Sequence, residues 1–296
     1  MDKDAALLVE ESELGGRRPK GWSRHLLFGL GVAWSLFQLW ATELGTLDPI
    51  RLRAVHLAFA LALAFLAYPG KRGPKDRVPL LDWALALLGA LGALYVVWDY
   101  YGITQIRGGI PSDRDVVMGT LTLLVLFVAS WRVVGPALPI IASVFILYAL
   151  TGPKGLIPYT LPSWLQLHAG SQWGQLMGQL YTTAEGIWGV PLGVSATFVF
   201  LFVLFGALLD KAGAGHFFIQ AAYALLGHFR GGPAKAAVVA SALTGVVSGS
   251  SVSNTVTTGT FTIPLMKRVG YPPEKAGAVE VASSSNGQLM PPVMGA

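Results

Sequence analysis

Polar residues interrupt a long apolar stretch near the end of the sequence. The segment SGSSVSNTVTTG, residues 248–259, carries hydroxyl groups, one amide and two glycines between apolar flanks. Its serine and threonine hydroxyls, the Asn254 carbonyl and any unwound backbone carbonyls are hard oxygen ligands, which suit Na⁺. We expect Gly249 and Gly259 to break the helix before Pro264, so that such carbonyls become available.

A second polar segment, SSSNGQ, occupies residues 283–288 and precedes Pro291 and Pro292. Because proline lacks a backbone donor and frees a carbonyl, we expect a broken helix whose polar groups face those of the first segment. Glu280, just before this segment, is either a partner for a proton or a cation, or an interfacial residue. Irregular backbone at membrane depth is tolerated only inside protein or beside a wet cavity. Both segments are therefore candidate ion and substrate sites.

Each polar segment also has a simpler interpretation. Small residues let helix backbones approach closely, so residues 248–259 are compatible with a helix–helix contact. Close packing requires small residues at four-residue spacing, however, and not a continuous polar run, which favours a binding site here. Residues 283–292 are equally compatible with half of a site and with a simple proline kink.

The sequence offers little support for an enzyme. The run Val247-Ser248-Gly249-Ser250 resembles a nucleophilic serine motif, but no histidine follows His228 to act as its base. The five histidines lack metal-binding spacing, cysteine is absent, and no P-loop lysine motif occurs. We expect no catalytic residue and no cofactor, and an intramembrane serine hydrolase is the least favoured interpretation.

The composition indicates a polytopic membrane protein. Of the 296 residues, 53% are hydrophobic and 12% are charged, whereas soluble domains carry about 25% charged residues. The net charge of +5 comes from basic residues that gather in alternate connections, which favours a cytoplasmic N-terminus. We expect no cleavable signal peptide before the first apolar block. We therefore expect an all-α fold in contact with membrane lipids, and no nucleic-acid partner.

The distribution of apolar blocks divides the chain into four parts. Residues 1–25 are expected to form a solvated cytoplasmic tail, 26–150 a small transmembrane helical domain, 151–191 an interfacial connection, and 192–296 a larger domain rich in Gly, Ser and Thr. Residues 216–229 either cross at a tilt or lie along the interface. The apolar blocks are residues 26–44, 54–68, 80–98, 116–131, 133–150, which we expect to kink near its start, and 192–209.

From about Glu185 to Ala296 the sequence resembles the large membrane subunit of tripartite ATP-independent periplasmic (TRAP) transporters, in particular fused permeases of the TAXI type. The resemblance is carried by EGIWGVPLGVSATFVFLFVLFGALL, GHFRGGPAKAAVVASALTGVVSGSSVSNTVTTGTFTIPLMKRVGYPP and EVASSSNGQLMPPVMGA. The first 150 residues are similar only in type, to the small four-helix subunit fused ahead of the large one.

The resemblance implies a secondary transporter of the bacterial inner membrane that imports organic acids (carboxylates) with Na⁺ by an elevator-type movement. It also implies a re-entrant helical hairpin, a broken helix, and a separate periplasmic TAXI-type solute-binding protein. Contacts to the coupling ion are expected from Ser248, Gly249, Ser250, Ser283, Ser285 and Gly287. Contacts to the substrate are expected from Ser250, Ser251, Asn254 and Asn286.

Two departures from the family pattern bear on this expectation. Dicarboxylate-type relatives often carry Asp near the position of Asn254, and a neutral side chain does not balance the charge of a cation. The family's large domain also continues past Pro291 and Pro292 through a second inverted half, so the resemblance implies a chain truncated at its C-terminus. The alternative from another functional class is a non-transporting membrane scaffold or assembly subunit.

Overall fold

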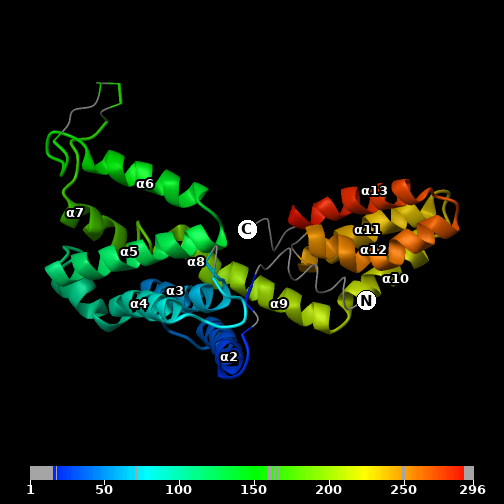
Figure 1. Cartoon of the computed structure of the whole chain (residues 1–296), viewed down its shortest axis with the longest axis horizontal. Coiled ribbons are helices and arrows are strands. Elements are labelled where there is room, and N and C mark those ends of the chain that lie inside the picture. Colours follow the sequence, from blue (N-terminus) through cyan, green and yellow to red (C-terminus); the bar gives the residue numbers. More distant parts are fainter. Residues whose placement is uncertain are drawn as a thin grey trace. The chain divides into compact units, whose positions relative to one another are not determined.

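The computed structural model describes residues 16–17, 19–70, 73–158, 162, 164–165, 167–248 and 251–289. These residues are helical apart from connections and one isolated β-bridge, as the sequence predicted. The chain divides into two compact units, one of residues 16–196 and one that contains residues 197–296 (Figure 1). Within the described ranges, five helices are long and apolar enough to cross a membrane.

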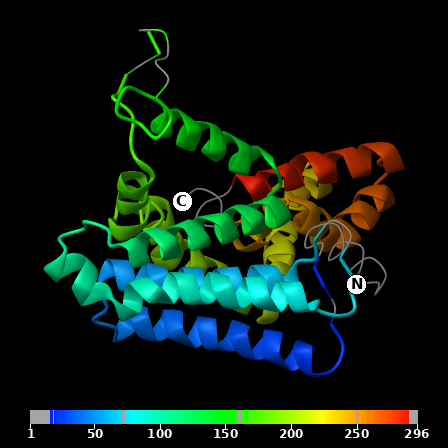
Figure 2. The same cartoon turned by 60° about the vertical axis from the view of Figure 1, so that its left-hand side comes forward.

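Four long helices form the bundle of the first unit. They are α2 (Trp22–Glu43), α3 (Pro49–Ala67), α4 (Leu80–Trp98) and α5 (Asp113–Val133), which run alongside one another in Figure 2. The core lies on α3, where Phe65 is fully buried. The outer helix α2 instead leaves most of its apolar surface exposed, as expected for a helix that faces lipid.

Local sequence fixes where two of these helices begin. The Asp48 carboxylate accepts a hydrogen bond from the backbone N–H of Ile50 (2.8 Å), and Pro49 occupies the first helical position of α3, where a missing N–H costs nothing. Ser112 and Asp115 form a reciprocal capping box at the start of α5. In the connection before it, a hydrogen bond to Asp99 (2.6 Å) raises the pKa of the Arg107 guanidinium.

Arg17 departs from the solvated tail expected over residues 1–25, of which residues 1–15 lie outside the described residues. Its side chain is buried, pairs with Asp82 of α4 and donates to the Phe65 carbonyl (2.9 Å). Arg132 of α5 also pairs with Asp82, with Nη1 2.7 Å from Oδ1. A buried carboxylate between two guanidinium groups holds Arg17 to α3, α4 and α5. Arg17 was expected in solvent because a basic cluster alone does not reveal a partner 65 residues away.

Shorter elements complete the first unit. They are the π-turn η1 (Gly102–Ile106), α6 (Ala137–Leu150), α7 (Trp173–Met177), the π-turn η2 (Gly178–Thr182) and α8 (Val190–Val194). Helix α6 is shorter than the apolar block 133–150, because Gly135 adopts φ 108° and Pro136 caps the helix. In η2, the buried Tyr181 hydroxyl donates to the Gly92 carbonyl of α4 (2.6 Å).

The second unit is built from helices rich in small residues. The π-turn η3 (Ser195–Val199) leads to α9 (Phe200–Lys211), α10 (Ala214–Leu226), α11 (Gly232–Ser248), α12 (Ser251–Arg268), α13 (Pro273–Ser284) and the 3₁₀ turn η4 (Ser285–Gln288). Alanines of α11 pack against Ile219 of α10 on one side and against Met266 and Ala276 on the other. Helix α11 is therefore central to this unit.

Helix α12 corrects the expectation that Gly259 breaks the polar segment. It runs without interruption through Gly259 and Pro264. A Cβ at position 259 would lie 3.2 Å from Cγ of Glu280, so this glycine provides room for a neighbouring side chain instead of ending the helix. Helices α11 and α12 pack against each other, but residues 249 and 250 between them lie outside the described residues. The re-entrant hairpin therefore stays a prediction.

Over the described part of the second polar segment the helix tightens without an interruption, so the expected break stays a prediction. Helix α13 ends at Ser284 and continues as the single 3₁₀ turn η4. Pro291 and Pro292 lie outside the described residues, so their expected role in the break is also still a prediction.

Candidate functional site

Buried polar side chains gather where α11, α12, α13 and η4 meet. Asn254, Thr258 and Thr262 are four residues apart, so they lie on one face of α12, and each is fully buried. Helices α11 and α13 supply the remaining members. We call this set the polar core: Ser241, Asn254, Thr258, Thr262, Glu280 and Ser284.

Glu280 is the acidic group of the polar core and is 0% exposed. Its Oε1 accepts hydrogen bonds from the hydroxyls of Thr258 and of Ser284 (3.1 Å), and its Oε2 accepts one from the hydroxyl of Thr262. Within the described ranges it forms no ion pair. A buried carboxylate is costly unless hydrogen bonds or an opposite charge compensate it. Here hydroxyl groups supply that compensation.

Asn254 presents an unsatisfied amide oxygen. Its Nδ2 donates to the backbone carbonyl of Ser241 (2.8 Å) and to the Ser241 hydroxyl (2.9 Å). Its Oδ1 is buried and has no donor among the described residues. Leaving such a group unpaired costs about 1–3 kcal/mol. A buried oxygen without a donor is a suitable ligand for a small cation or an acceptor for a ligand hydroxyl.

A close backbone approach holds the polar core together. A Cβ at Gly245 of α11 would lie 2.8 Å from Cα of Gly287 and 3.5 Å from Nδ2 of Asn254. Such a distance to a backbone atom leaves no room for any side chain at position 245. Gly245 thus allows η4 and the Asn254 face of α12 to meet on α11.

The structure brings together two residues that the resemblance placed in the site. Asn254 and Gly287 are both buried and both lie against Gly245. Ser283 is also buried, but its hydroxyl donates to the backbone carbonyls of Val279 (2.7 Å) and Glu280 (3.0 Å). The hydroxyl oxygen of Ser283 still has free lone pairs and can bind a cation.

The other expected site residues are less favourably placed or lie outside the description. Ser251 begins α12 and Asn286 lies in η4, both half-buried. Ser285 is exposed, and its hydroxyl donates to the Val281 carbonyl (3.1 Å), so the structure does not bring it to the polar core. Ser248 ends α11, and its side chain is outside the description, as are residues 249 and 250 entirely.

Four members of the polar core were not singled out as individual ligands: Ser241 and Thr262, and also Thr258 and Ser284, which lie within the two predicted polar segments. The sequence held a signal for two of them, because Thr258 and Thr262 follow Asn254 at four-residue spacing. Helical periodicity would have selected this face from the continuous polar run. Ser241 gave no signal, since a single serine in an apolar helix is usually a packing residue.

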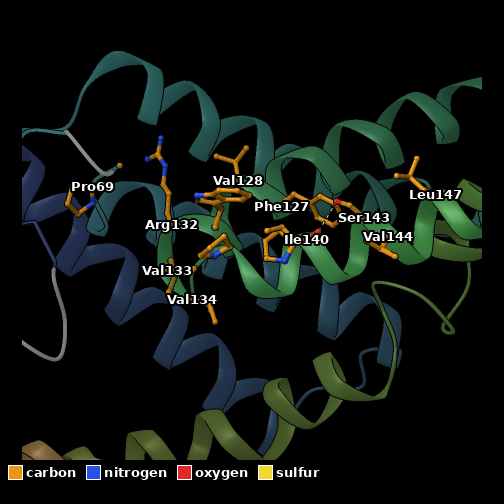
Figure 3. Close-up of a pocket in the computed structure, with 15 residues that line it drawn as sticks. Pro69, Phe127, Val128, Arg132, Val133, Val134, Ile140, Ser143, Val144 and Leu147 are labelled. Atoms are coloured by element: carbon orange, nitrogen blue, oxygen red, sulfur yellow. Dashed lines mark hydrogen bonds between the residues drawn. The ribbon is translucent and has the colours of Figure 1, made fainter.

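A groove of about 810 Å³ lies elsewhere, between α5 and α6 of the first unit. Figure 3 shows apolar side chains along it, with Arg132 toward one end. Arg132 is already paired with Asp82. The groove therefore lacks the convergent polar groups with which a small-molecule site fixes the orientation of its ligand.

Comparison with known proteins points to a transporter family. A family model described as the DctM component of the tripartite ATP-independent periplasmic transporter matches residues 121–296. The large permease protein DctM of a C4-dicarboxylate TRAP transporter from Rhodobacter capsulatus is 37% identical over 91 residues, which are 31% of this chain and 21% of that protein. The uncharacterized protein YgiK of Salmonella typhimurium is 34% identical over 91 residues, with the same coverage.

A longer alignment joins the chain to TeaC, the ectoine TRAP transporter large permease protein of Halomonas elongata. It is 27% identical over 146 residues, which are 48% of this chain and 34% of TeaC. The chain thus spans between a fifth and about a third of the length of these relatives. No solved structure matches.

Proposed function

Because the chain belongs to the DctM family of tripartite ATP-independent periplasmic transporters, we propose that it is a permease component that imports organic acids. The family is one of transporter permeases and not of enzymes. The match over residues 121–296 carries the proposal, because it contains every helix of the polar core. Relatives named for C4-dicarboxylate and for ectoine support a small organic substrate.

The finer assignment is a fused permease of the TAXI type in the bacterial inner membrane. It rests on the motifs between Glu185 and Ala296 and on the charged, four-helix character of the region before α6. The partner is then a periplasmic TAXI-type solute-binding protein. The second unit moves against the first in an elevator-type cycle, with the N-terminus in the cytoplasm.

We place the coupling-ion and substrate contacts at the α11–α12 junction and in η4. In this proposal α11 and α12 form a re-entrant hairpin, Na⁺ is bound by oxygens of residues 248–250 and 283–287, and the substrate carboxylate lies beside Ser251 and Asn254. The unpaired Oδ1 of Asn254 supports a ligand at this point, since an incoming cation or hydroxyl would satisfy it.

The test is uptake by the full-length protein in proteoliposomes, with its binding protein and a panel of labelled mono- and dicarboxylates. We expect uptake that requires a Na⁺ gradient, and a loss of Na⁺ dependence in Ser250→Ala and Asn254→Ala. The matched control is Thr260→Val, because Thr260 is exposed on the same helix and its hydroxyl donates to the Thr257 carbonyl (3.0 Å). No carboxylate uptake by the wild type would overturn the function. Unchanged Na⁺ dependence in both variants would overturn the site.

A further inference from the structure

Helix α6 borders a groove on the first unit that no described side chain fills. Of its 14 residues, Pro139 and Leu150 are the buried ones. Val144 and Leu147 line the groove of about 810 Å³ between α6 and α5, and both are more than half exposed. The polar side chain that α6 contributes, Ser143, donates its hydroxyl to the Pro139 carbonyl (2.7 Å). The wall formed by α6 therefore offers a ligand apolar contacts.

One end of this groove carries an uncompensated positive charge. Arg132 lines that end together with Pro69 and Gly70, and Figure 3 shows it far from Leu147 at the other end. Arg132 and the buried Arg17 both pair with the carboxylate of Asp82. Among the described residues no second acidic group pairs with either guanidinium. An excess buried charge is costly unless an opposite charge approaches it, so this end of the groove favours an anion.

The length of the groove matches one leaflet of a bilayer. It follows α6 from Pro136 to Leu147, a distance of about 17 Å at the rise of an α-helix. The hydrocarbon of one leaflet is about 15 Å thick, half of the bilayer core. The connection that supplies Pro69 and Gly70 also carries the exposed Lys75 and Arg77, and basic connections of this kind lie at the cytoplasmic surface. The charged end of the groove is therefore expected at the level of the cytoplasmic headgroups.

We propose that the groove binds one anionic glycerophospholipid of the cytoplasmic leaflet, with its phosphate at Arg132 and an acyl chain along α6. Basic pockets between helices on the cytoplasmic side attract such headgroups. Nη1 of Arg132 faces Asp82 (2.7 Å), and the guanidinium has further N–H donors for phosphate oxygens. The acyl chain supplies the packing against α5 that α6 lacks. A segment of the polypeptide is the competing occupant of the groove.

Native mass spectrometry of the purified full-length protein tests this site with phosphatidylglycerol and phosphatidylcholine as probes. The wild type should retain phosphatidylglycerol about fivefold better, the effect of one basic group on an anionic lipid. Arg132→Gln should remove this preference, and Arg132→Lys should keep it because the charge remains. Ser143→Phe should displace the lipid by filling the groove, whereas Ile141→Phe, at an exposed position of α6 outside the groove, should not. Equal retention of the two lipids by the wild type, or no effect of Ser143→Phe, would overturn the proposal.

An introduced thiol distinguishes a lipid from a segment of the polypeptide. The 296 residues contain no cysteine, so Ser143→Cys places a thiol in the groove, and the unsubstituted protein is the control for background labelling. N-ethylmaleimide should label this thiol in lipid-free detergent, and phosphatidylglycerol should protect it more than phosphatidylcholine does. Adding Arg132→Gln should abolish that difference. Protection without any lipid would mean that the polypeptide fills the groove, and labelling that neither lipid slows would mean that lipid does not enter it; either result contradicts the proposal.

Discussion

At the residue scale, Gly245 sets how closely the helices of the polar core approach. A Cβ at this position would lie 2.8 Å from Cα of Gly287, and backbone atoms cannot move aside as a flexible side chain can. We expect Gly245→Ala to destabilise the protein by about 1–3 kcal/mol, as overpacking does. Thermal unfolding in detergent measures the loss, and Na⁺-dependent uptake should fall with it.

Gly277→Ala is the matched control for this change. Gly277 also lies inside a helix, α13, but a Cβ there would meet no atom within 4 Å. Because alanine is the better helix former, this variant should gain up to about 1 kcal/mol. Equal effects of the two substitutions would contradict the proposed close contact at Gly245.

Asp82 is the second residue at which we expect a substitution to lower the stability of the protein. It is the only described carboxylate that pairs with either Arg17 or Arg132, so Asp82→Asn leaves two guanidinium groups without their counter-charge. Removing one partner of a buried pair costs about 3–5 kcal/mol. We expect a large fall in thermal stability, whereas Asp76→Asn, at an exposed position in the connection that precedes α4, should have little effect. A small effect of Asp82→Asn would mean that the pair is solvated.

The residues of the site were predictable only in part. Asn254 was predicted as a ligand because a polar side chain in an apolar segment needs a physical reason, whereas Gly287 was predicted from the family resemblance. Glu280 was ambiguous from the sequence alone, since acidic residues near a helix start usually face water. Its burial depends on Thr258, Thr262 and Ser284, which lie on different turns and helices. No local pattern reports contacts of that kind, because tertiary packing creates them.

At the element scale, the π-turn η2 fixes the connection after α6 to the helical bundle. Tyr181 is fully buried, and its hydroxyl donates to the Gly92 carbonyl (2.6 Å). Tyr181→Phe should lower stability by about 1 kcal/mol, the net value of one hydrogen bond, and somewhat more if the carbonyl stays unpaired. The matched control is Tyr148→Phe. The hydroxyl of Tyr148 donates to the carbonyl of Leu165 in an exposed connection. Equal stability losses would contradict a specific role for η2.

The length of an apolar block predicts the ends of some helices and not of others. The block 80–98 coincides with α4, whereas α3 begins at Pro49, five residues before its expected start. The difference arises because Asp48 and Pro49 start the helix within a polar stretch. In α12 the sequence predicts a break at Gly259, but the helix continues through this residue. The missing side chain of Gly259 instead leaves room for Glu280.

At the scale of the whole molecule, the predicted orientation can be measured directly. The chain contains no cysteine, so each introduced thiol is a unique reporter. Lys75→Cys lies in the exposed α3–α4 connection and Ile110→Cys in the exposed α4–α5 connection. With the N-terminus in the cytoplasm, a membrane-impermeant maleimide should label position 110 in intact spheroplasts and position 75 only after lysis. The reverse pattern would contradict the positive-inside assignment.

The ion pair at Asp82 also has a consequence for how the chain is made. Arg17 leaves the ribosome 65 residues before its partner, and Arg132 follows later still. The first segment therefore waits, with its charge in water, until α3 and α4 have been inserted. Assembly of this unit is ordered in time, and the N-terminal segment takes its final place after the helices that follow it.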